Sequence, residues 1–228
     1  MNIIERNFET IMQEDRQGQQ FDGENRQMVE YSIVSHRDVR ELTRRIDQAA
    51  EQLLGAGTIF TSGCSILNVG DTGWHANLGW HPSMLGGRSE PPVGHCYSGL
   101  CAGLYLDRLT RDTGCLRVFP GSHMLPNAIL DLLAPIHLDI PNNFSANGRI
   151  ERFGIAPREV PGHTIESEPG DVIFFNHEIW HASFGGNPIR RSISLSYKAS
   201  PTTDREHEYI QTCKRKERRD AEGAGMAS

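Results

Sequence analysis

The chain has 228 residues, and its 29 acidic residues outnumber its 23 basic ones to give a formal net charge of −6. A prior of roughly 150 residues per domain predicts one domain over 1–228. The acidic balance argues against nucleic-acid partners, which bind clustered Lys and Arg. No stretch approaches the roughly 18 apolar residues of a membrane helix. The polar N-terminus does not resemble a signal peptide, and the five cysteines contain no CxxC pair, which favours the cytoplasm.

The first 34 residues are rich in Gln, Glu and Arg and have weak hydrophobic periodicity, so we expect a loosely packed arm with at most a short helix. A clear helix should follow, because Ser35 and Asp38 form a Ser-x-x-Asp capping box. Apolar residues then recur at spacings of three and four, which marks one helix face that Gly55 and Gly57 end. These apolar residues are Val39, Leu42, Ile46, Ala49 and Leu53.

Residues 58–198 contain short apolar runs separated by Gly, Pro and Asn, as expected of strands joined by turns. The runs are 58–60, 65–69, 99–106, 115–119, 172–175 and 192–197. Helical patterns occur near 126–133 and after a capping box at Thr203 and Glu206. Many short strands with helices at the ends predict a mainly β fold, a double-stranded β-helix of the jelly-roll or cupin-like type. The polar segments 134–162 and 82–93 are predicted to cover a binding pocket.

His177, Glu178 and His181 form a His-Glu-x-x-His pattern, which binds zinc when it lies on a helix. Here the pattern directly follows the strand-like run 172–175. Residues four apart on a strand share a face but lie about 13 Å apart, too far to bind one ion. A zinc hydrolase is therefore the least favoured interpretation.

One histidine on each of two strands offers a different metal site. His75, Asn77 and His181 have the layout of the facial triad of non-haem iron oxygenases, which leaves positions for 2-oxoglutarate and O2. The departure is that Asn77 stands where a carboxylate is expected. Arg190 has the donor geometry to bind a carboxylate with two hydrogen bonds, and Ser183 shares a strand face with His181.

Sequence blocks in one consistent order extend this pattern: Trp-His-Ala-Asn at 74–77, Pro-Gly-Ser-His at 120–123, Pro-Gly-Asp-Val at 169–172 and Trp-His-Ala-Ser at 180–183. With Arg190, they resemble the phytanoyl-CoA dioxygenase (PhyH)-like family of Fe(II)/2-oxoglutarate-dependent oxygenases, which includes ectoine hydroxylase. The resemblance implies a double-stranded β-helix and a dioxygenase that uses Fe(II), 2-oxoglutarate and O2. Such an enzyme hydroxylates, or otherwise oxidises, a C–H bond of a small molecule.

The resemblance also assigns roles to individual residues. His75 and His181 match the iron-ligating histidines, and Asn77 occupies the position of the third ligand. Arg190 matches the arginine that pairs with the distal carboxylate of 2-oxoglutarate, and Ser183 matches its hydroxyl partner. Thr72 falls where family members place a further co-substrate contact.

Other histidines and one strand face have less specific expectations. His123, in Pro-Gly-Ser-His, is expected to be structural. Surface positions or satisfied core positions are expected for His95, His163 and His177. On a strand over 99–106, three residues share one face, and the sequence leaves open whether that face lines the pocket: Cys101, Gly103 and Tyr105.

Asn77 is nearly the size of Asp but neutral, so it binds a metal only through its carbonyl oxygen. Four interpretations remain open: an engineered Asp-to-Asn change, a native but weaker ligand, a halogenase-like relative, or a binder of 2-oxoglutarate and substrate without turnover. Halogenases place Ala or Gly at this position, so that interpretation ranks below the first two. Asp71 is a conceivable substitute ligand, but it lies too far along the strand.

Overall fold

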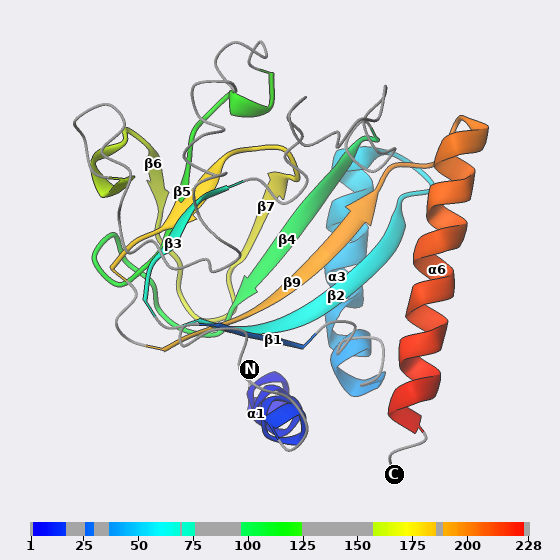
Figure 1. Cartoon of the computed structure of the whole chain (residues 1–228), viewed down its shortest axis with the longest axis horizontal. Helices are drawn as coiled ribbons and strands as arrows, with labels where there is room; N and C mark the ends of the chain where they lie inside the picture. Colours follow the sequence, from blue (N-terminus) through cyan, green and yellow to red (C-terminus); the bar gives the residue numbers. More distant parts are fainter. Residues whose placement is uncertain are drawn as a thin grey trace, which may run out of the picture.

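The computed structural model describes residues 2–16, 26–29, 37–68, 70–75, 97–124, 157–185 and 189–225. The strands within these ranges form two antiparallel sheets, with orders β1-β2-β9-β4-β7 and β3-β8-β5-β6 (Figure 1). The larger sheet contains β1 (Arg26–Val29), β2 (Ile59–Asn68), β9 (Arg190–Lys198), β4 (Gly99–Tyr105) and β7 (Val172–Asn176). The smaller sheet contains β3 (Thr72–His75), β8 (His181–Ser183), β5 (Leu116–Val118) and β6 (His163–Ile165). The predicted mainly β, double-stranded β-helix is confirmed.

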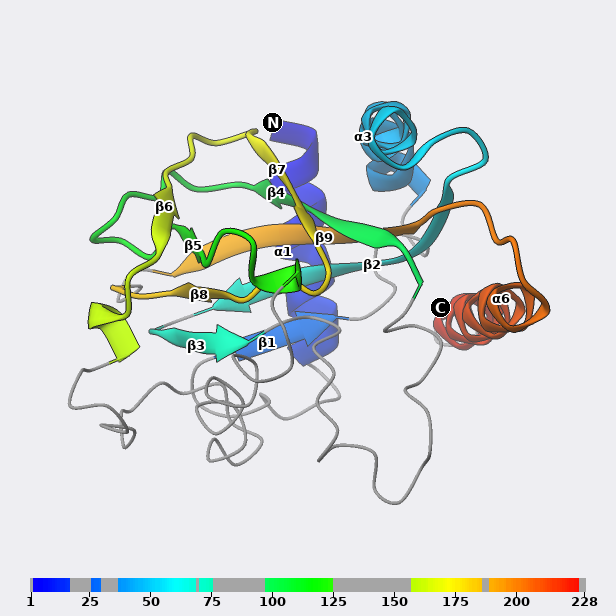
Figure 2. The same ribbon diagram turned by 90° about the horizontal axis from the view of Figure 1, so that it is seen from above.

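Helices flank the sheets at both ends of the chain: α1 (Asn2–Arg16), α3 (Arg37–Leu54) and α6 (Asp204–Gly225), besides the short 3-10 turns η2 (Ser122–Met124) and η3 (Pro157–Glu159). Figures 1 and 2 show α3 and α6 beyond the larger sheet, on the side away from the smaller one. Among the helices the structure describes, none combines the length and the apolar character needed to cross a membrane.

The N-terminal arm expected over residues 1–34 is a packed part of the fold wherever the structure describes it. The side chains of Phe8 and Met12 on α1 are 0% and 2% exposed and join the core cluster. Strand β1 pairs with β2 from Arg26 to Val29. Phe8, Ile11 and Met12 already show helical spacing in the sequence, and this apolar stripe explains why the segment packs.

Period-two alternation on β4 and β9 separates the core from the cavity between the sheets. On β9, Ile193, Leu195 and Tyr197 are buried in the core with residues of α1 and α3. The alternate residues Ser192 and Ser194 line the cavity instead. The apolar face therefore holds the helices, and the small polar face is left for a ligand.

Most of the predicted helices and strands that fall on described residues are present in the structure. Helix α3 covers the predicted apolar stripe, and the runs 58–60 and 65–69 form one strand, β2. Helix α6 begins directly after Thr203, whose N–H donates to Glu206 Oε2 over 3.0 Å as in the predicted capping box, and it ends at Gly225. The helical pattern at 126–133, the segment 82–93 and most of 134–162 lie outside the described residues.

Candidate active site

Two directly opposed residue pairs of the β3–β8 ladder, which we call rungs, carry the predicted site residues. His75 pairs with His181, and Thr72 pairs with Ser183. The step between the rungs is three residues on β3 and two on β8, so β3 contains a bulge of one residue. Without it, residues three apart would face opposite sides of the sheet. The bulge therefore lets Thr72 and His75 line the same cavity.

The imidazole rings of His75 and His181 lie against each other, with centroids 4.2 Å apart. Each Nδ1 donates to the carbonyl oxygen two residues earlier, to Gly73 over 2.8 Å and to Ile179 over 2.9 Å. Because a carbonyl oxygen carries no proton, each neutral ring keeps its proton on Nδ1 and its lone pair on Nε2. Metal-binding histidines use this arrangement. Burial lowers the pKa of His181 to about 4, which keeps its ring neutral at pH 7.

Arg190, the first residue of β9, is buried among neutral hydrogen-bond acceptors. Its Nη1 donates to Gly114 O (3.0 Å) and Ser183 Oγ, and its Nη2 donates to Gly70 O (2.6 Å) and Thr72 Oγ1 (3.4 Å). In the described part of the chain, no carboxylate forms an ion pair with Arg190 and its buried Nε has no acceptor. Burial lowers the pKa of the guanidinium, which is still charged at neutral pH. Asp71 acts on Arg190 only through space, and a buried cation with no carboxylate in direct contact favours binding of a carboxylate ligand.

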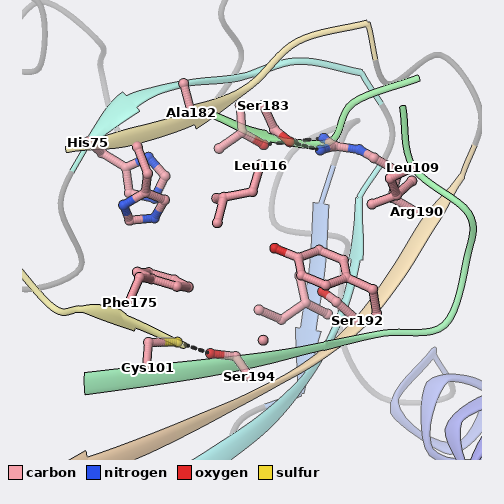
Figure 3. Close-up of a pocket in the computed structure, with 15 residues that line it drawn as sticks. His75, Cys101, Leu109, Leu116, Phe175, Ala182, Ser183, Arg190, Ser192 and Ser194 are labelled. Atoms are coloured by element: carbon pink, nitrogen blue, oxygen red, sulfur yellow. Dashed lines mark hydrogen bonds between the residues drawn. The ribbon is translucent and has the colours of Figure 1, made fainter. Parts of the chain in front are cut away.

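A cavity of about 120 Å³ extends from the histidine pair to Arg190 (Figure 3). On its floor, Cys101 Sγ lies 3.1 Å from Ser194 Oγ, and burial raises the pKa of this thiol to about 12, so it stays protonated. At the histidine end, the ring of Phe175 lies 5.0 Å from that of His181. The face of β4 whose role the sequence left open lines the cavity, through Cys101, Gly103 and Tyr105.

The histidine pair fits two positions of a metal site. Over the ranges that the structure describes, no other His, Cys, Asp or Glu joins the pair to make a group of three. The predicted third ligand, Asn77, lies outside the described residues. Asp71 is already engaged, because its carboxylate accepts the Gly185 N–H over 2.7 Å and pairs with Arg158 at 2.6 Å.

The His-Glu-x-x-His pattern does not lie on a helix. His177 and Glu178 form a turn after β7, and His181 begins β8. Of the two positions expected for His177, surface or core, the structure shows the core: its side chain is 5% exposed, and the Leu100 backbone partly offsets the effect of burial on its pKa. Burial, and then the nearby charge of Lys198, lowers its pKa to about 4. His163 is exposed, and His95 lies outside the described residues.

Two antiparallel sheets around a cavity define a cupin-type double-stranded β-helix. The family model described as phytanoyl-CoA dioxygenase (PhyH) matches residues 2–192. The chain therefore belongs to this family, as its sequence blocks predict. No curated protein sequence matches the chain.

Solved structures of 13–20% identity share the fold. The non-haem α-ketoglutarate-dependent epimerase SnoN from nogalamycin biosynthesis has 20% identity and a TM-score of 0.54, over 85% of this chain and 74% of SnoN. Iron-bound HygX from Streptomyces hygroscopicus has 13% identity and a TM-score of 0.59, over 86% of this chain and 79% of HygX. The apoform of EctD from S. alaskensis has 15% identity and a TM-score of 0.54, over 86% of this chain and 67% of EctD. A second SnoN structure contains Fe3+, α-ketoglutarate and nogalamycin RO.

Proposed function

We propose that this protein is an Fe(II)- and 2-oxoglutarate-dependent dioxygenase that oxidises a C–H bond of a small molecule, in the simplest case by hydroxylation. The observation that carries the proposal is the pair of rungs on β3 and β8. One rung has two imidazoles with their lone pairs on Nε2. The other lies beside a buried guanidinium that no carboxylate of the described residues contacts directly, although Asp71 acts on it through space. A metal and a dicarboxylate are the ligands that complement these two ends.

In this proposal His75 and His181 bind iron through Nε2, and the side chain at position 77 supplies a third donor. The carbonyls of Gly73 and Ile179 fix the two rings by accepting their Nδ1 protons. When bound, iron and 2-oxoglutarate use O2 to oxidise the substrate, with one oxygen atom entering succinate, the other entering the substrate in a hydroxylation, and CO2 released.

The co-substrate would lie along the cavity, with its distal carboxylate at Arg190, Ser183 and Thr72. The neutral acceptors around Arg190 hold the guanidinium in place without neutralising it. Asp71 acts on it only through space, so the ligand carboxylate would be the anion in direct contact. Leu116 lies between the two ends and Phe175 lies against His181 (Figure 3). These apolar side chains exclude water from the space between the two polar ends.

We further propose that residues 1–228 act as one oxygenase domain in the cytoplasm. The acidic net charge and the small cavity support a small-molecule substrate rather than nucleic acid or a membrane.

The decisive experiment measures succinate released from 2-oxoglutarate by the full chain supplied with Fe(II), ascorbate and O2. The proposal predicts succinate formation that a His181→Ala variant abolishes and a His163→Ala variant retains. Hydrolysis that requires zinc and ignores 2-oxoglutarate would instead favour a zinc hydrolase at His177, Glu178 and His181. The candidate substrates for this assay are small molecules with unactivated C–H bonds.

Asn77 supports a second candidate, because the family position normally carries Asp. In this alternative the protein binds 2-oxoglutarate and substrate without turnover. Binding of 2-oxoglutarate in a calorimetric titration, with no succinate at any substrate concentration, would favour it. A halogenase-like activity is the remaining alternative, and chloride incorporation into the substrate would identify it.

A further inference from the structure

Ser122, in the Pro-Gly-Ser-His segment at residues 120–123, accepts a hydrogen bond from the same peptide group that accepts the imidazole proton of His181. We infer that Ser122 is a positioning residue for His181 and that it acts through the single peptide group joining Ile179 to Trp180. The inference rests on the proposed function, because it concerns a proposed metal ligand. It goes beyond that function by assigning a role to a residue outside the cavity.

The two hydrogen bonds of this peptide group connect Ser122 to the imidazole. The peptide N–H, which belongs to Trp180, donates to Ser122 Oγ over 2.8 Å. The peptide carbonyl, which belongs to Ile179, accepts from His181 Nδ1 over 2.9 Å. Because a peptide group is planar and rigid, it cannot rotate away from Ser122 without also moving the acceptor of the imidazole proton.

Ser122 is itself held firmly in place. Its side chain is 0% exposed, and its N–H donates to the carbonyl of Phe119 over 3.1 Å. The Phe119 N–H in turn donates to the carbonyl of Trp180 over 2.8 Å. The turn over 119–122 therefore holds both the N–H and the carbonyl of Trp180, the residue directly before His181. His123, the next residue of the segment, is exposed, so within this segment the contact toward His181 belongs to Ser122.

Loss of the Ser122 hydroxyl would act on the imidazole in two ways. The Trp180 N–H would lose its Ser122 acceptor while it stays buried, which is unfavourable and favours rotation of the peptide. The Ile179 carbonyl would also become a weaker acceptor, since hydrogen bonds in a chain strengthen one another. Both effects weaken the hydrogen bond that keeps the proton of His181 on Nδ1 and that fixes the direction of Nε2. Loss of such outer partners typically lowers metal affinity about 10–100-fold.

The test compares Ser122→Ala with Ser167→Ala in the full chain. Ser167 is a matched control, because its side chain is 5% exposed and its hydroxyl has no partner among the described residues. Long-range 1H–15N spectra of the metal-free protein report which nitrogen of each imidazole carries the proton. Titration with Co(II) reports metal affinity. We expect Ser122→Ala to shift the Nδ1–H signal of His181 but not that of His75, and to weaken Co(II) binding about 10–100-fold. Ser167→Ala should change neither.

The inference is overturned if Ser122→Ala leaves the His181 signal and the Co(II) affinity unchanged, or if both imidazole signals shift equally, as general loosening would produce. If Ser122→Ala does not fold, Ser122→Cys, which is similar in size and a weaker acceptor, replaces it with the same outcomes. Failure of the proposed function is distinguishable, because Co(II) binding would then be insensitive to His75→Ala. The His181 signal in the metal-free protein would still report on Ser122.

Discussion

The guanidinium of Arg190 donates a hydrogen bond to the hydroxyl of Ser183. That hydroxyl in turn donates to the carbonyl oxygen of Gly114 over 2.6 Å. The Arg190 Nη1 donates to the same carbonyl. The three groups therefore form a closed hydrogen-bonded triangle without a negative charge. This geometry orients a cation toward the cavity with no carboxylate in contact, so that a ligand can add to the through-space effect of Asp71 on its charge.

Arg190→Lys should weaken 2-oxoglutarate binding although the positive charge is retained. A lysine ammonium cannot reproduce the planar fork that holds these acceptors and a carboxylate together. A lost charged hydrogen bond is worth about 1.5–3 kcal/mol, so we expect roughly 10–100-fold weaker binding in an anaerobic calorimetric titration. Arg191→Lys is the control, because Arg191 pairs with Asp107 and Glu9 outside the cavity. A loss seen only in the Arg191 variant would transfer the role to that residue.

Removal of either cavity histidine should abolish metal binding, whereas removal of His177 should not. His75 and His181 oppose each other across one ladder, while His177 lies on the turn after β7. Competition with a metal-chelating dye measures Co(II) affinity for His75→Ala, His181→Ala and His177→Ala. Strong loss in His177→Ala, with retention in His75→Ala, would contradict this assignment and favour the His177–His181 pair.

Asn77→Asp should raise both metal affinity and succinate production. The substitution restores a negative charge to the proposed metal site, and outer-partner changes alone alter affinity or activity about 10–100-fold, so a direct ligand should have at least that effect. The measurement compares succinate production by three proteins: the Asn77 protein, Asn77→Asp and Asn77→Gly. Each is loaded with Fe(II) anaerobically before O2 is added. Equal rates for the Asn77 and Asn77→Asp proteins would show that Asn is a competent native ligand. Asn77→Gly tests whether an open position admits chloride.

The burial of His177 should make the folded protein less stable in mild acid. The pKa of His177 is about 4 in the folded protein, whereas the ordinary value of 6.5 applies to the unfolded chain. Between these two pH values the unfolded chain therefore binds more protons than the folded protein. Stability is therefore fully present above pH 6.5 and falls as the pH drops toward 4, by on the order of 2–3 kcal/mol for this group. Lys198 and His181 lower the pKa of His177 further, and both residues are retained in the His177→Gln variant.

Urea unfolding of wild type and His177→Gln at pH 7.5, 6 and 5 measures this dependence. The variant should lose less stability between pH 7.5 and 5 than wild type does. His163→Gln, at an exposed position on β6, should retain the wild-type dependence. Parallel curves for wild type and His177→Gln would show that His177 does not titrate differently on unfolding.

The periodic elements of the fold were predictable because packing imposes their period on the sequence. The alternating Ser and apolar residues of 192–197 predict a strand, and the structure assigns its two faces to the cavity and the core. The α3 stripe and the Thr203–Glu206 cap are equally visible, because each depends on side chains at fixed spacing. The short strands β6 and β8 span three residues each, too few for a periodic signal.

The parts of the site that the sequence did not reveal depend on the backbone. The bulge in β3 adds one residue without any characteristic side chain, yet it decides that Thr72 and His75 share a cavity. The acceptors of Arg190 include the carbonyls of Gly70 and Gly114, and every residue carries such a group. The contact between Ser122 and the 179–180 peptide is invisible for the same reason.

The spacing between the two rungs of β3 and β8 has a consequence for co-substrate selectivity. His181 and Ser183 are two residues apart on β8, a step of about 6.6 Å that the strand repeat fixes. In the proposed function, one end of a 2-oxo diacid binds the metal held by the two histidines, and its distal carboxylate must reach Arg190 over this fixed step, so the number of carbons between the two ends matters. Oxaloacetate is one carbon shorter than 2-oxoglutarate and 2-oxoadipate one carbon longer, and both should fit poorly. Substitutions of single side chains should thus reduce affinity for all three diacids while leaving their order of preference intact.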